Sequence, residues 1–435
     1  MKKMINSDIT ILGGGASGII AAISAAYNLK DSNKPYNITI LEKNNQIGKK
    51  ILMTGNGKCN LTNTKISPKN YNLSSRSFIE DILNKYPSEF IINLFNNFGL
   101  LTRMDSTGRV YPYSNQASSV LDVLINELSK LNVNIICNFD TISIKKEKNK
   151  FYIESSDLIV SSNKLIISCG GKSAPTSTLC TDAYKHLKSF SHTISPLLPA
   201  LVPIKTNSGY EKNLKGIRSQ SKINVIADEN LIHTEYGEIQ FTDSGLSGIC
   251  IFQISYLIGE FLKFHTINKT PVKKVFISID FMPEFSTSDI INLLRNIIKN
   301  SPGNTINNLL IGLLNKKLGQ VILNKSKIYD LSKKYHELSD KQLKNISQTI
   351  KNFTFVPIEL FPFKNSQVTS GGAILKEFNP LTLESKKVSG LYACGEILDV
   401  NGDCGGYNLH WAWVSGFIAG KSASNLFIKT KGVKK

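Results

Sequence analysis

Residues 8–30 read DITILGGGASGIIAAISAAYNLK, and this stretch decides the fold class. Residues 8–12 form an apolar run that predicts a buried strand, and three glycines follow directly. The pattern of residues 19–30 predicts a helix, and residues 36–43, YNITILEK, predict the next strand. The order of strand, glycine turn, helix and strand is that of a βαβ unit.

The glycines of this turn have the GxGxxG spacing of a dinucleotide-binding turn. Gly13 permits a tight turn, Gly15 lets backbone N–H groups approach a pyrophosphate, and Gly18 allows close packing of helix and strand. The helix N-terminus adds partial positive charge. Glu42 ends the next strand, where its carboxylate can accept both hydroxyls of an adenosine ribose. An acid there favours FAD or NAD over NADP; the alternative is a glycine turn that binds nothing.

Residues 48–63, GKKILMTGNGKCNLTN, favour FAD over NAD. A simple dehydrogenase would continue here with regular βα units. This loop is instead rich in glycine and lysine, and it can offer N–H donors and Lys49 or Lys50 to a long cofactor. The alternative interpretation is a solvated surface loop.

A second glycine-rich region lies near the C-terminus. Residues 389–396, SGLYACGE, predict a short buried strand that ends in Gly395 and Glu396. Residues 404–420, CGGYNLHWAWVSGFIAG, predict a glycine turn that opens a helix. This second helix N-terminus can face the other end of a cofactor that residues 13–18 already hold.

Single residues of this region suggest their own roles. Gly405 and Gly406 let backbone approach a flat ring, and Asp399 can bond a ribityl hydroxyl. The alternative is a buried helix with tryptophan in the core, and for Trp411 and Trp413 we prefer that interpretation.

The length of 435 residues predicts two or three domains. Helical patterns recur at 77–98 and 117–131, residues 137–168 resemble an antiparallel meander, and residues 287–351 are strongly helical. No repeat is visible. The expected segments are the first part of the FAD domain (1–194), a β-rich insertion (195–285), a helical subdomain (286–351), a return to the insertion (352–366) and the rest of the FAD domain (367–435).

Composition excludes some classes of protein. The chain has no run of apolar residues long enough to span a membrane, and its start resembles a strand rather than a signal peptide, so we expect a cytoplasmic protein. The seven cysteines are scattered and form no CxxC, which argues against a disulfide framework, a zinc or other metal site and a dithiol reductase. The formal charge of +19 invites an RNA or DNA partner, but the lysines are dispersed, so we rate that partner below a small molecule.

Six segments together carry a resemblance to a known family. They are GGGASG (13–18), LEKNNQIGKKILMTGNGKCNLTN (41–63), GRVYPYSNQASSV (108–120), GEIQFTDSGLSG (237–248), VTSGGA (368–373) and GLYACGEILDVNGDCGGYNLHWAW (390–413). In this order they resemble the BaiN-like (YhiN-type) NAD(P)/FAD-dependent oxidoreductases, also labelled the aminoacetone oxidase family, over nearly the whole chain. GKCNLTN and GDCGGYNL are specific to that family.

The resemblance implies an α/β fold: a Rossmann-like two-dinucleotide-binding FAD domain, built from both chain ends, with a β-barrel-like insertion and a helical subdomain. It implies noncovalent FAD. The contacts that it carries over are Ala16, Ser17, Glu42, Lys43, Lys49, Gly55, Asn60, Glu396, Asp399, Asn408 and Leu409, with Thr141 and Ile142 meeting adenine through backbone. One departure stands at 176–184, TSTLCTDAY, where the family has a glycine-rich turn.

The expected chemistry is hydride exchange between flavin N5 and a small organic substrate. The resemblance points to reduction of a carbon–carbon double bond conjugated to a carbonyl. No second GxGxxG follows residue 18, so we expect NADH or NADPH to bind transiently as the donor. The alternatives are an amine-type oxidase that uses dioxygen and a basic flavoprotein that acts on or binds RNA.

Candidates for acid–base groups are few. His410 can face the flavin, although a helix histidine bonded to a neighbouring loop is the preferred interpretation. Arg109, Tyr111 and Tyr113 can line the substrate side, the alternative being a structural turn around Pro112. Cys59 is more readily a packed residue than a nucleophile.

Overall fold

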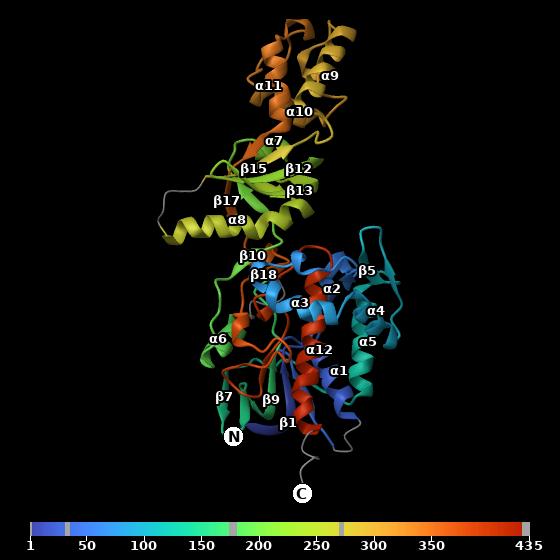
Figure 1. Cartoon of the computed structure of the whole chain (residues 1–435), viewed down its shortest axis with the longest axis vertical. Helices are drawn as coiled ribbons and strands as arrows, with labels where there is room; N and C mark the ends of the chain where they lie inside the picture. The colour runs from blue at the N-terminus through green and yellow to red at the C-terminus, as the bar shows by residue number, and fades with distance from the viewer. Residues whose placement is uncertain (1, 31–34, 174–180, 269–273, 429–435) are drawn as a thin grey trace. The chain divides into compact units, whose positions relative to one another are not determined.

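The computed structural model describes residues 2–30, 35–173, 181–268 and 274–428. The chain divides into two compact units (Figure 1). Unit 1 comprises Met1–Leu198 and Val368–Lys435, and unit 2 comprises Pro199–Gln367. Within the described ranges, no helix has the length and apolar character needed to cross a membrane.

A parallel sheet forms the centre of unit 1, with β19, β9, β1, β2 and β6 side by side. Leu12 at the end of β1 pairs with Leu41 of β2 and with Ile167 of β9, so the strands end at one edge. The carboxyl edge of such a sheet is where dinucleotides bind. The parallel strands are β1 (Lys3–Leu12), β2 (Ile38–Leu41), β6 (Asn134–Ile136), β9 (Leu158–Ile167) and β19 (Leu391–Ala393).

Two helices from opposite ends of the chain pack closely in unit 1, namely α1 (Ala16–Lys30) and α12 (Tyr407–Ile428) (Figure 1). Glycines of α12 permit the approach: a Cβ on Gly416 would lie 2.2 Å from the carbonyl oxygen of Ser17, and one on Gly420 would lie 2.1 Å from that of Ala21. The predicted FAD domain built from both chain ends therefore has a shared core.

The remaining elements of unit 1 surround this sheet. The antiparallel meander predicted at 137–168 consists of β7 and β8 leading into β9. The helices are α2 (Lys49–Met53), α3 (Arg76–Lys85), α4 (Ser88–Asn97), α5 (Ala117–Lys130) and α6 (Thr181–Ser189). The strands are β3 (Thr62–Asn63), β4 (Thr102–Met104), β5 (Arg109–Pro112), β7 (Ser143–Glu147), β8 (Lys150–Glu154) and β18 (Val368–Ser370), which pairs with β10 (Leu198–Ala200).

Unit 2 contains a seven-stranded antiparallel sheet in the order β16, β15, β12, β13, β14, β11, β17. Its edge strands β16 (Phe353–Phe355) and β17 (Pro357–Leu360) are separated only by Val356. The sheet must therefore curl until its edges approach, which is the predicted barrel-like form. The other strands are β11 (Ile204–Thr206), β12 (Arg218–Ala227), β13 (Asn230–Phe241), β14 (Gly245–Ser247) and β15 (Val275–Asp280), with helices α7 (Glu211–Leu214) and α8 (Ile249–Asn268).

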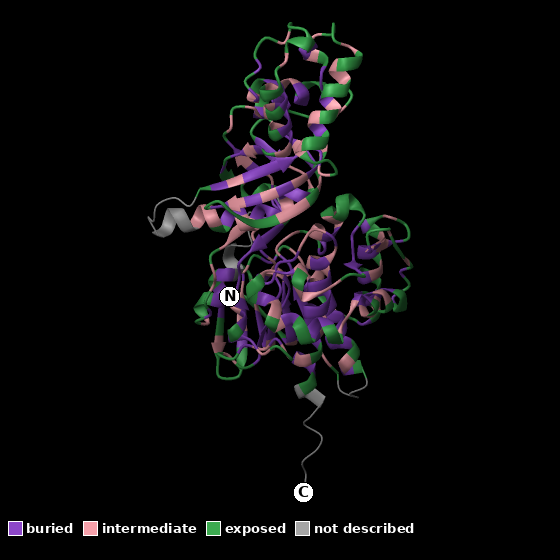
Figure 2. Ribbon diagram, turned by 45° about the horizontal axis from the view of Figure 1, so that its top comes forward, coloured by how far each residue is buried: buried purple, intermediate pink, exposed green. Residues whose placement is uncertain are grey.

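Three helices follow β15 and form the predicted helical subdomain. They are α9 (Thr287–Asn300), α10 (Lys316–Lys325) and α11 (Asp340–Lys351). Their apolar faces join the core of unit 2, and their outer faces are exposed (Figure 2). Ser286 and Ser339 begin α9 and α11 with capping boxes, which satisfy free N–H groups of the first turns.

Candidate functional site

The turn after β1 has an open side at the N-terminus of α1. A Cβ on Gly13 would lie 2.7 Å from the carbonyl oxygen of Ser168, and one on Gly18 would lie 1.9 Å from that of Gly13. A Cβ on Gly15 would meet nothing within 4 Å. Gly13 and Gly18 are therefore needed for packing, whereas Gly15 faces free space. The first N–H groups of a helix have no partner within it, so this space fits an anionic pyrophosphate.

Glu42 lies at the end of β2, beside this turn, and is 8% exposed. Its Oε2 accepts a 2.8 Å hydrogen bond from the N–H of Gly14. Its Oε1 accepts from the backbone N–H of Asn44 at 2.8 Å and from the side-chain amide at 2.6 Å. The carboxylate thus fixes the glycine turn and retains acceptor capacity for one further donor. Lys43 next to it forms an ion pair with Asp140.

The C-terminal glycine region lies directly against the N-terminal one. Gly395 has φ +78°, and a Cβ there would lie 2.4 Å from the hydroxyl of Ser17. Trp411 donates from its indole to the carbonyl of Gly395 at 3.1 Å. Both tryptophans are buried, and Trp413 packs edge-on against Phe95, so the core interpretation of the tryptophans is confirmed.

Glu396 is the centre of a cluster that joins three distant segments. The ammonium of Lys50 lies 2.7 Å from Oε2. Oε1 accepts from the hydroxyl of Ser173 at 2.9 Å and from the N–H of Thr369 at 2.6 Å. Burial raises the pKa of Glu396, but Lys50 and these donors outweigh it and hold the pKa below its usual value. Lys49, which the resemblance carries over, is partly exposed on the same short helix, α2.

Protein groups already bond two of the candidate cofactor contacts in this region. Asp399 accepts from the hydroxyl of Ser195 at 2.9 Å and from the amide of Asn72 at 3.2 Å, and burial raises its pKa. The side chain of Asn408 donates to the carbonyl of Gly402 and accepts from its N–H, both at 2.8 Å. Leu409 packs against the core of unit 1. These side chains shape the second turn, so any contact with a cofactor would be additional.

Two buried oxygen atoms without hydrogen-bond partners in the described part of the chain indicate whether this region fits a bound ligand. Asn60 Oδ1 and Thr141 Oγ1 are buried and have no hydrogen-bond partner among the described residues. A Cβ on Gly406 would lie 2.8 Å from Asn60 Oδ1, so the second glycine turn borders this orphaned acceptor. Gly55 lies on the same loop, next to the backbone of Asn60. A buried acceptor without a donor is costly, and a bound molecule that donates to it removes the cost.

Arg109, Tyr111 and Cys404 form a cluster at the same turn. The Arg109 guanidinium stabilises the ionised forms of Tyr111 and Cys404, which lowers both pKa values, but burial is the larger effect and raises both. Both groups therefore stay protonated at neutral pH beside a permanently charged guanidinium. A Cβ on Gly405 would lie 3.7 Å from Arg109 Nε. The cluster and Asn60 thus border the same glycine turn.

The other proposed acid–base groups are placed differently. Tyr113 is exposed, and its ring lies under the guanidinium of Arg103 rather than beside Arg109. His410 is fully buried: Nδ1 lies 2.8 Å from the hydroxyl of Thr62, and Nε2 lies 3.0 Å from the carbonyl of Tyr86. Burial lowers the pKa of His410 to about 3, so the ring is neutral and donates from Nε2. This is the preferred geometry of a helix histidine bonded to neighbouring segments.

Cys59 has the environment of a packed residue. Its side chain is fully buried, and burial raises the pKa of its thiol to about 12. The departure at 176–184 lies largely outside the described residues, which omit 174–180 and the side chains of 181–183.

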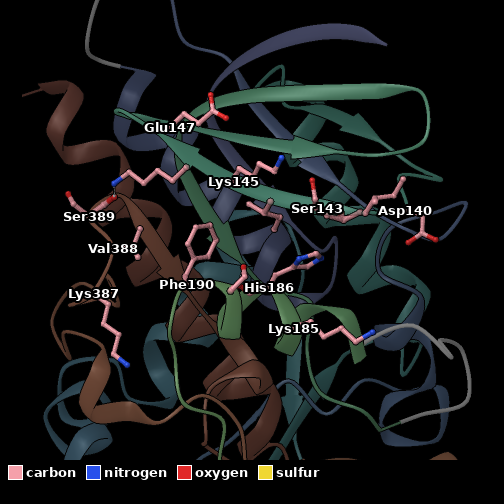
Figure 3. Close-up of a pocket in the computed structure, with 15 residues that line it drawn as sticks. Asp140, Ser143, Lys145, Glu147, Lys185, His186, Phe190, Lys387, Val388 and Ser389 are labelled. Atoms are coloured by element: carbon pink, nitrogen blue, oxygen red, sulfur yellow. Dashed lines mark hydrogen bonds between the residues drawn. The ribbon is translucent and has the colours of Figure 1, made fainter. Parts of the chain in front are cut away.

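An open hollow of about 1140 Å³ lies on the outer side of the meander (Figure 3). It is bordered by β7, by α6 and by residues 387–389. Thr141 and Ile142, which the resemblance assigns to adenine, lie at its edge. Its lining contains four lysines and two acidic residues, Asp140 and Glu147.

Sequence reasoning missed several members of these clusters. Ser173 contacts Glu396 from a segment that carries no recognisable signal, and Thr369 contacts it from VTSGGA (368–373), where no single residue was assigned a role. Asn72 and Ser195 bind Asp399, likewise from segments without a recognisable signal. Cys404 could have been found, because it stands inside the GDCGGYNL segment next to two glycines.

Comparison with known proteins adds the family. Residues 7–422 match the model described as HI0933-like protein Rossmann domain. The 3-dehydro-bile acid delta(4,6)-reductase of Clostridium scindens is 35% identical over 96% of this chain and 98% of its own length. The ribosomal RNA dihydrouridine synthase of Escherichia coli is 28% identical over 96% of this chain and 99% of its own length.

Solved structures were also matched. A quinol fumarate reductase of E. coli has a TM-score of 0.48 at 14% identity, covering 100% of this chain and 72% of that one. A flavocytochrome c3 fumarate reductase has a TM-score of 0.46 at 12% identity, covering 98% and 79%. The family match over nearly the whole chain is the decisive comparison: the chain belongs to the HI0933-like family, the BaiN- and YhiN-type flavoproteins, and is an FAD-dependent oxidoreductase.

Proposed function

We propose that this chain uses NADH or NADPH to reduce a carbon–carbon double bond conjugated to a carbonyl. The observation that carries the proposal is the cluster of Arg109, Tyr111 and Cys404 beside the Gly405–Gly406 turn. Such a reduction adds a hydride to the carbon β to the carbonyl and a proton to the α carbon. It requires an electrophile for the carbonyl and an acid that is protonated at neutral pH.

FAD, when bound, supplies the hydride transfer. The residues that would hold it come from both chain ends. The open turn at Gly15 and the N-terminus of α1 suit its pyrophosphate, and Glu42 suits a ribose hydroxyl. The orphaned acceptors of Asn60 and Thr141 would receive donors from the cofactor. Lys50 and Glu396 hold the two glycine regions together through their ion pair.

Within the cluster, we assign the carbonyl of the substrate to the Arg109 guanidinium, which is always charged and has several N–H donors. Cys404 stands on the turn itself and is our proposed proton donor, from Sγ to the α carbon. Tyr111, whose pKa is likewise raised by burial and lowered less by Arg109, is the alternative donor. A neutral thiol with a raised pKa can donate a proton without first requiring a base.

The test separates the two half-reactions. The flavin is reduced anaerobically with NADPH or NADH and then mixed with α,β-unsaturated ketones, including cyclohexenone and a 4-en-3-one steroid. Rapid anaerobic reoxidation by one of these compounds supports the proposal. Reoxidation by dioxygen alone, with no response to any conjugated carbonyl, would replace it with the oxidase alternative.

A second candidate is reduction of uridine in RNA. The uracil C5=C6 bond is itself conjugated to the C4 carbonyl, so the same cluster would serve. The relative from E. coli is named a ribosomal RNA dihydrouridine synthase, and this chain carries a formal charge of +19. The specific observation that favours this candidate is the distribution of that charge within unit 2.

A further inference from the structure

The helical subdomain of unit 2, residues 286–351, carries a charge that the rest of the unit lacks. It contains eleven Lys and Arg but four Asp and Glu, a net charge of +7. The remaining residues of Pro199–Gln367 contain ten of each and are neutral. A general bias of the chain toward lysine would affect both parts alike. The excess therefore belongs to the subdomain itself.

The four acidic side chains of the subdomain are all engaged locally. Asp289 caps α9 through Ser286, and Glu337 accepts from the N–H of Lys334. Asp330 accepts from Ser332, and Asp340 pairs with Arg295 at 2.9 Å. These carboxylates stabilise turns and helix starts. Asp340 forms an ion pair with Arg295, and the bonds from Ser332 together with the attraction of Lys333 hold the pKa of Asp330 below its usual value.

Most of the basic side chains are left without an ion pair among the described residues; the exceptions include Arg295, which pairs with Asp340, and Lys351, which pairs with Asp280. Eight of them are exposed and have no ion pair within the described part of the chain: Lys299, Lys316, Lys317, Lys327, Lys333, Lys334, Lys341 and Lys344. In α11, Lys341 and Lys344 are three residues apart and lie opposite the buried face that contains Leu343 and Ile346. The charge therefore faces solvent (Figure 2).

One stretch combines this charge with an exposed aromatic ring. Between α10 and α11, Lys327, Lys333 and Lys334 flank Tyr329, which is 76% exposed. The N–H of Ile306 bonds the carbonyl of Lys333 at 2.9 Å, so the backbone there is fixed rather than free. We call Lys327, Tyr329, Lys333 and Lys334 the basic loop.

We propose that the helical subdomain is an RNA-docking surface, with the basic loop at its centre. Lysine ammonium groups neutralise phosphates, and an exposed tyrosine stacks on an unpaired base. This combination fits single-stranded segments of a folded RNA better than a purely anionic surface, which offers nothing for the ring. The proposal rests on the second candidate function, because that function requires the protein to bind RNA.

The test compares two triple variants of the full-length, FAD-loaded protein. The loop variant is Lys327→Gln, Lys333→Gln and Lys334→Gln. The control variant is Lys212→Gln, Lys274→Gln and Lys364→Gln, which removes the same charge from exposed positions of the β-rich part of unit 2. The probe is purified ribosomal RNA, and binding is titrated at several KCl concentrations.

We expect the loop variant to bind at least about ten-fold more weakly near 0.1 M salt, and its plot of log affinity against log salt to lose a slope of about 2. The control variant should stay within about three-fold of the parent protein. Tyr329→Ala should weaken binding by about ten-fold without changing the salt slope, because stacking releases no counterions.

Equal losses in the loop and control variants would overturn the proposal, because the charge would then act without a defined surface. Binding to phosphatidylglycerol vesicles but not to RNA would also overturn it and identify a membrane surface instead. The cyclohexenone assay contains no RNA. If cyclohexenone fails to reoxidise the flavin but RNA binding still depends on the basic loop, only the reductase proposal is contradicted. If cyclohexenone reoxidises the flavin but RNA binding does not depend on the basic loop, only the docking proposal is contradicted.

Discussion

The ammonium of Lys50 lies 2.7 Å from Oε2 of Glu396, across 346 residues of sequence. This ion pair joins the short helix α2, which follows β2, to the turn after β19. Ser173 and Thr369 bond the same carboxylate. Because the two glycine regions come from opposite chain ends, their alignment depends on such contacts.

Replacing this carboxylate should therefore destabilise unit 1. We expect Glu396→Gln to cost about 2 kcal/mol, because an amide leaves the Lys50 ammonium without its counterion. The matched control is Glu154→Gln, which breaks a pair with Lys2 at the surface; solvent screens this pair, so its loss should shift the unfolding midpoint less than the loss of Glu396 does. The unfolding midpoint of each variant is measured from the rise in flavin fluorescence as the cofactor is released on heating. Equal midpoints for Glu396→Gln and Glu154→Gln would contradict this role of Glu396.

The open space at Gly15 gives a test of the cofactor site. Neither Gly15 nor Gly303 would bring a new Cβ within 4 Å of another atom. A valine should consequently fit the folded chain at either position. We expect Gly15→Val to weaken FAD binding by at least about 100-fold, since the side chain would occupy the proposed pyrophosphate space and repel a group that needs close backbone approach. Gly303→Val should bind FAD normally.

The measurement is the flavin-to-protein ratio after purification and after titration with FAD. Circular dichroism should show the same helix content in both glycine variants. A Gly15→Val protein that retains full flavin would contradict the placement of the pyrophosphate.

The pKa of His410 predicts an acid-sensitive fold. Burial holds the folded pKa at about 3, whereas an unfolded histidine titrates near 6.5. Between these values the unfolded state binds one more proton, so stability falls as pH drops. The loss should reach about 2 kcal/mol at pH 5 and be absent at pH 7.

His410→Gln removes this proton uptake, so the difference in flavin-release midpoint between pH 7 and pH 5 should shrink. His336→Gln is the control, because that histidine is exposed in unit 2 and should leave the difference unchanged. An unchanged pH dependence in His410→Gln would show that other groups control the acid response.

The proton-donor assignment predicts a split between half-reactions. Cys404→Ala should leave flavin reduction by NAD(P)H within about three-fold and slow reoxidation by a conjugated ketone by about 100-fold. If Tyr111 is the donor, Tyr111→Phe rather than Cys404→Ala should slow reoxidation by about 100-fold. Tyr113→Phe is the matched control, because its ring is exposed beside Arg103. Stopped-flow absorbance follows both half-reactions, and normal reoxidation in the Cys404 and Tyr111 variants would remove the cluster from the chemistry.

Local patterns in the sequence were sufficient for much of the fold. The βαβ unit, the position of Glu42 at a strand end and the helix opened at Gly406 each depend on neighbouring residues, and the structure has all three. The burial of Trp411 and Trp413 also follows from a local apolar pattern.

Contacts between distant segments were beyond the sequence. The sequence offered Lys49 and Lys50 equally as contacts for a long cofactor. Only the fold shows that Lys50 pairs with Glu396. The sequence left Asp399 available for a ribityl hydroxyl, whereas Ser195 and Asn72 already bond that side chain. The lysine excess in residues 286–351, by contrast, can be counted from the sequence within the predicted bounds; only the exposure of these side chains comes from the structure.

The central claim is an FAD enzyme that takes electrons from a nicotinamide nucleotide. Its most direct test is an absorption spectrum of the purified protein, followed by anaerobic addition of NADH and then NADPH. We predict flavin bands that one of the two nucleotides bleaches. A protein that stays colourless after incubation with FAD, or flavin bands that neither nucleotide bleaches, would contradict it.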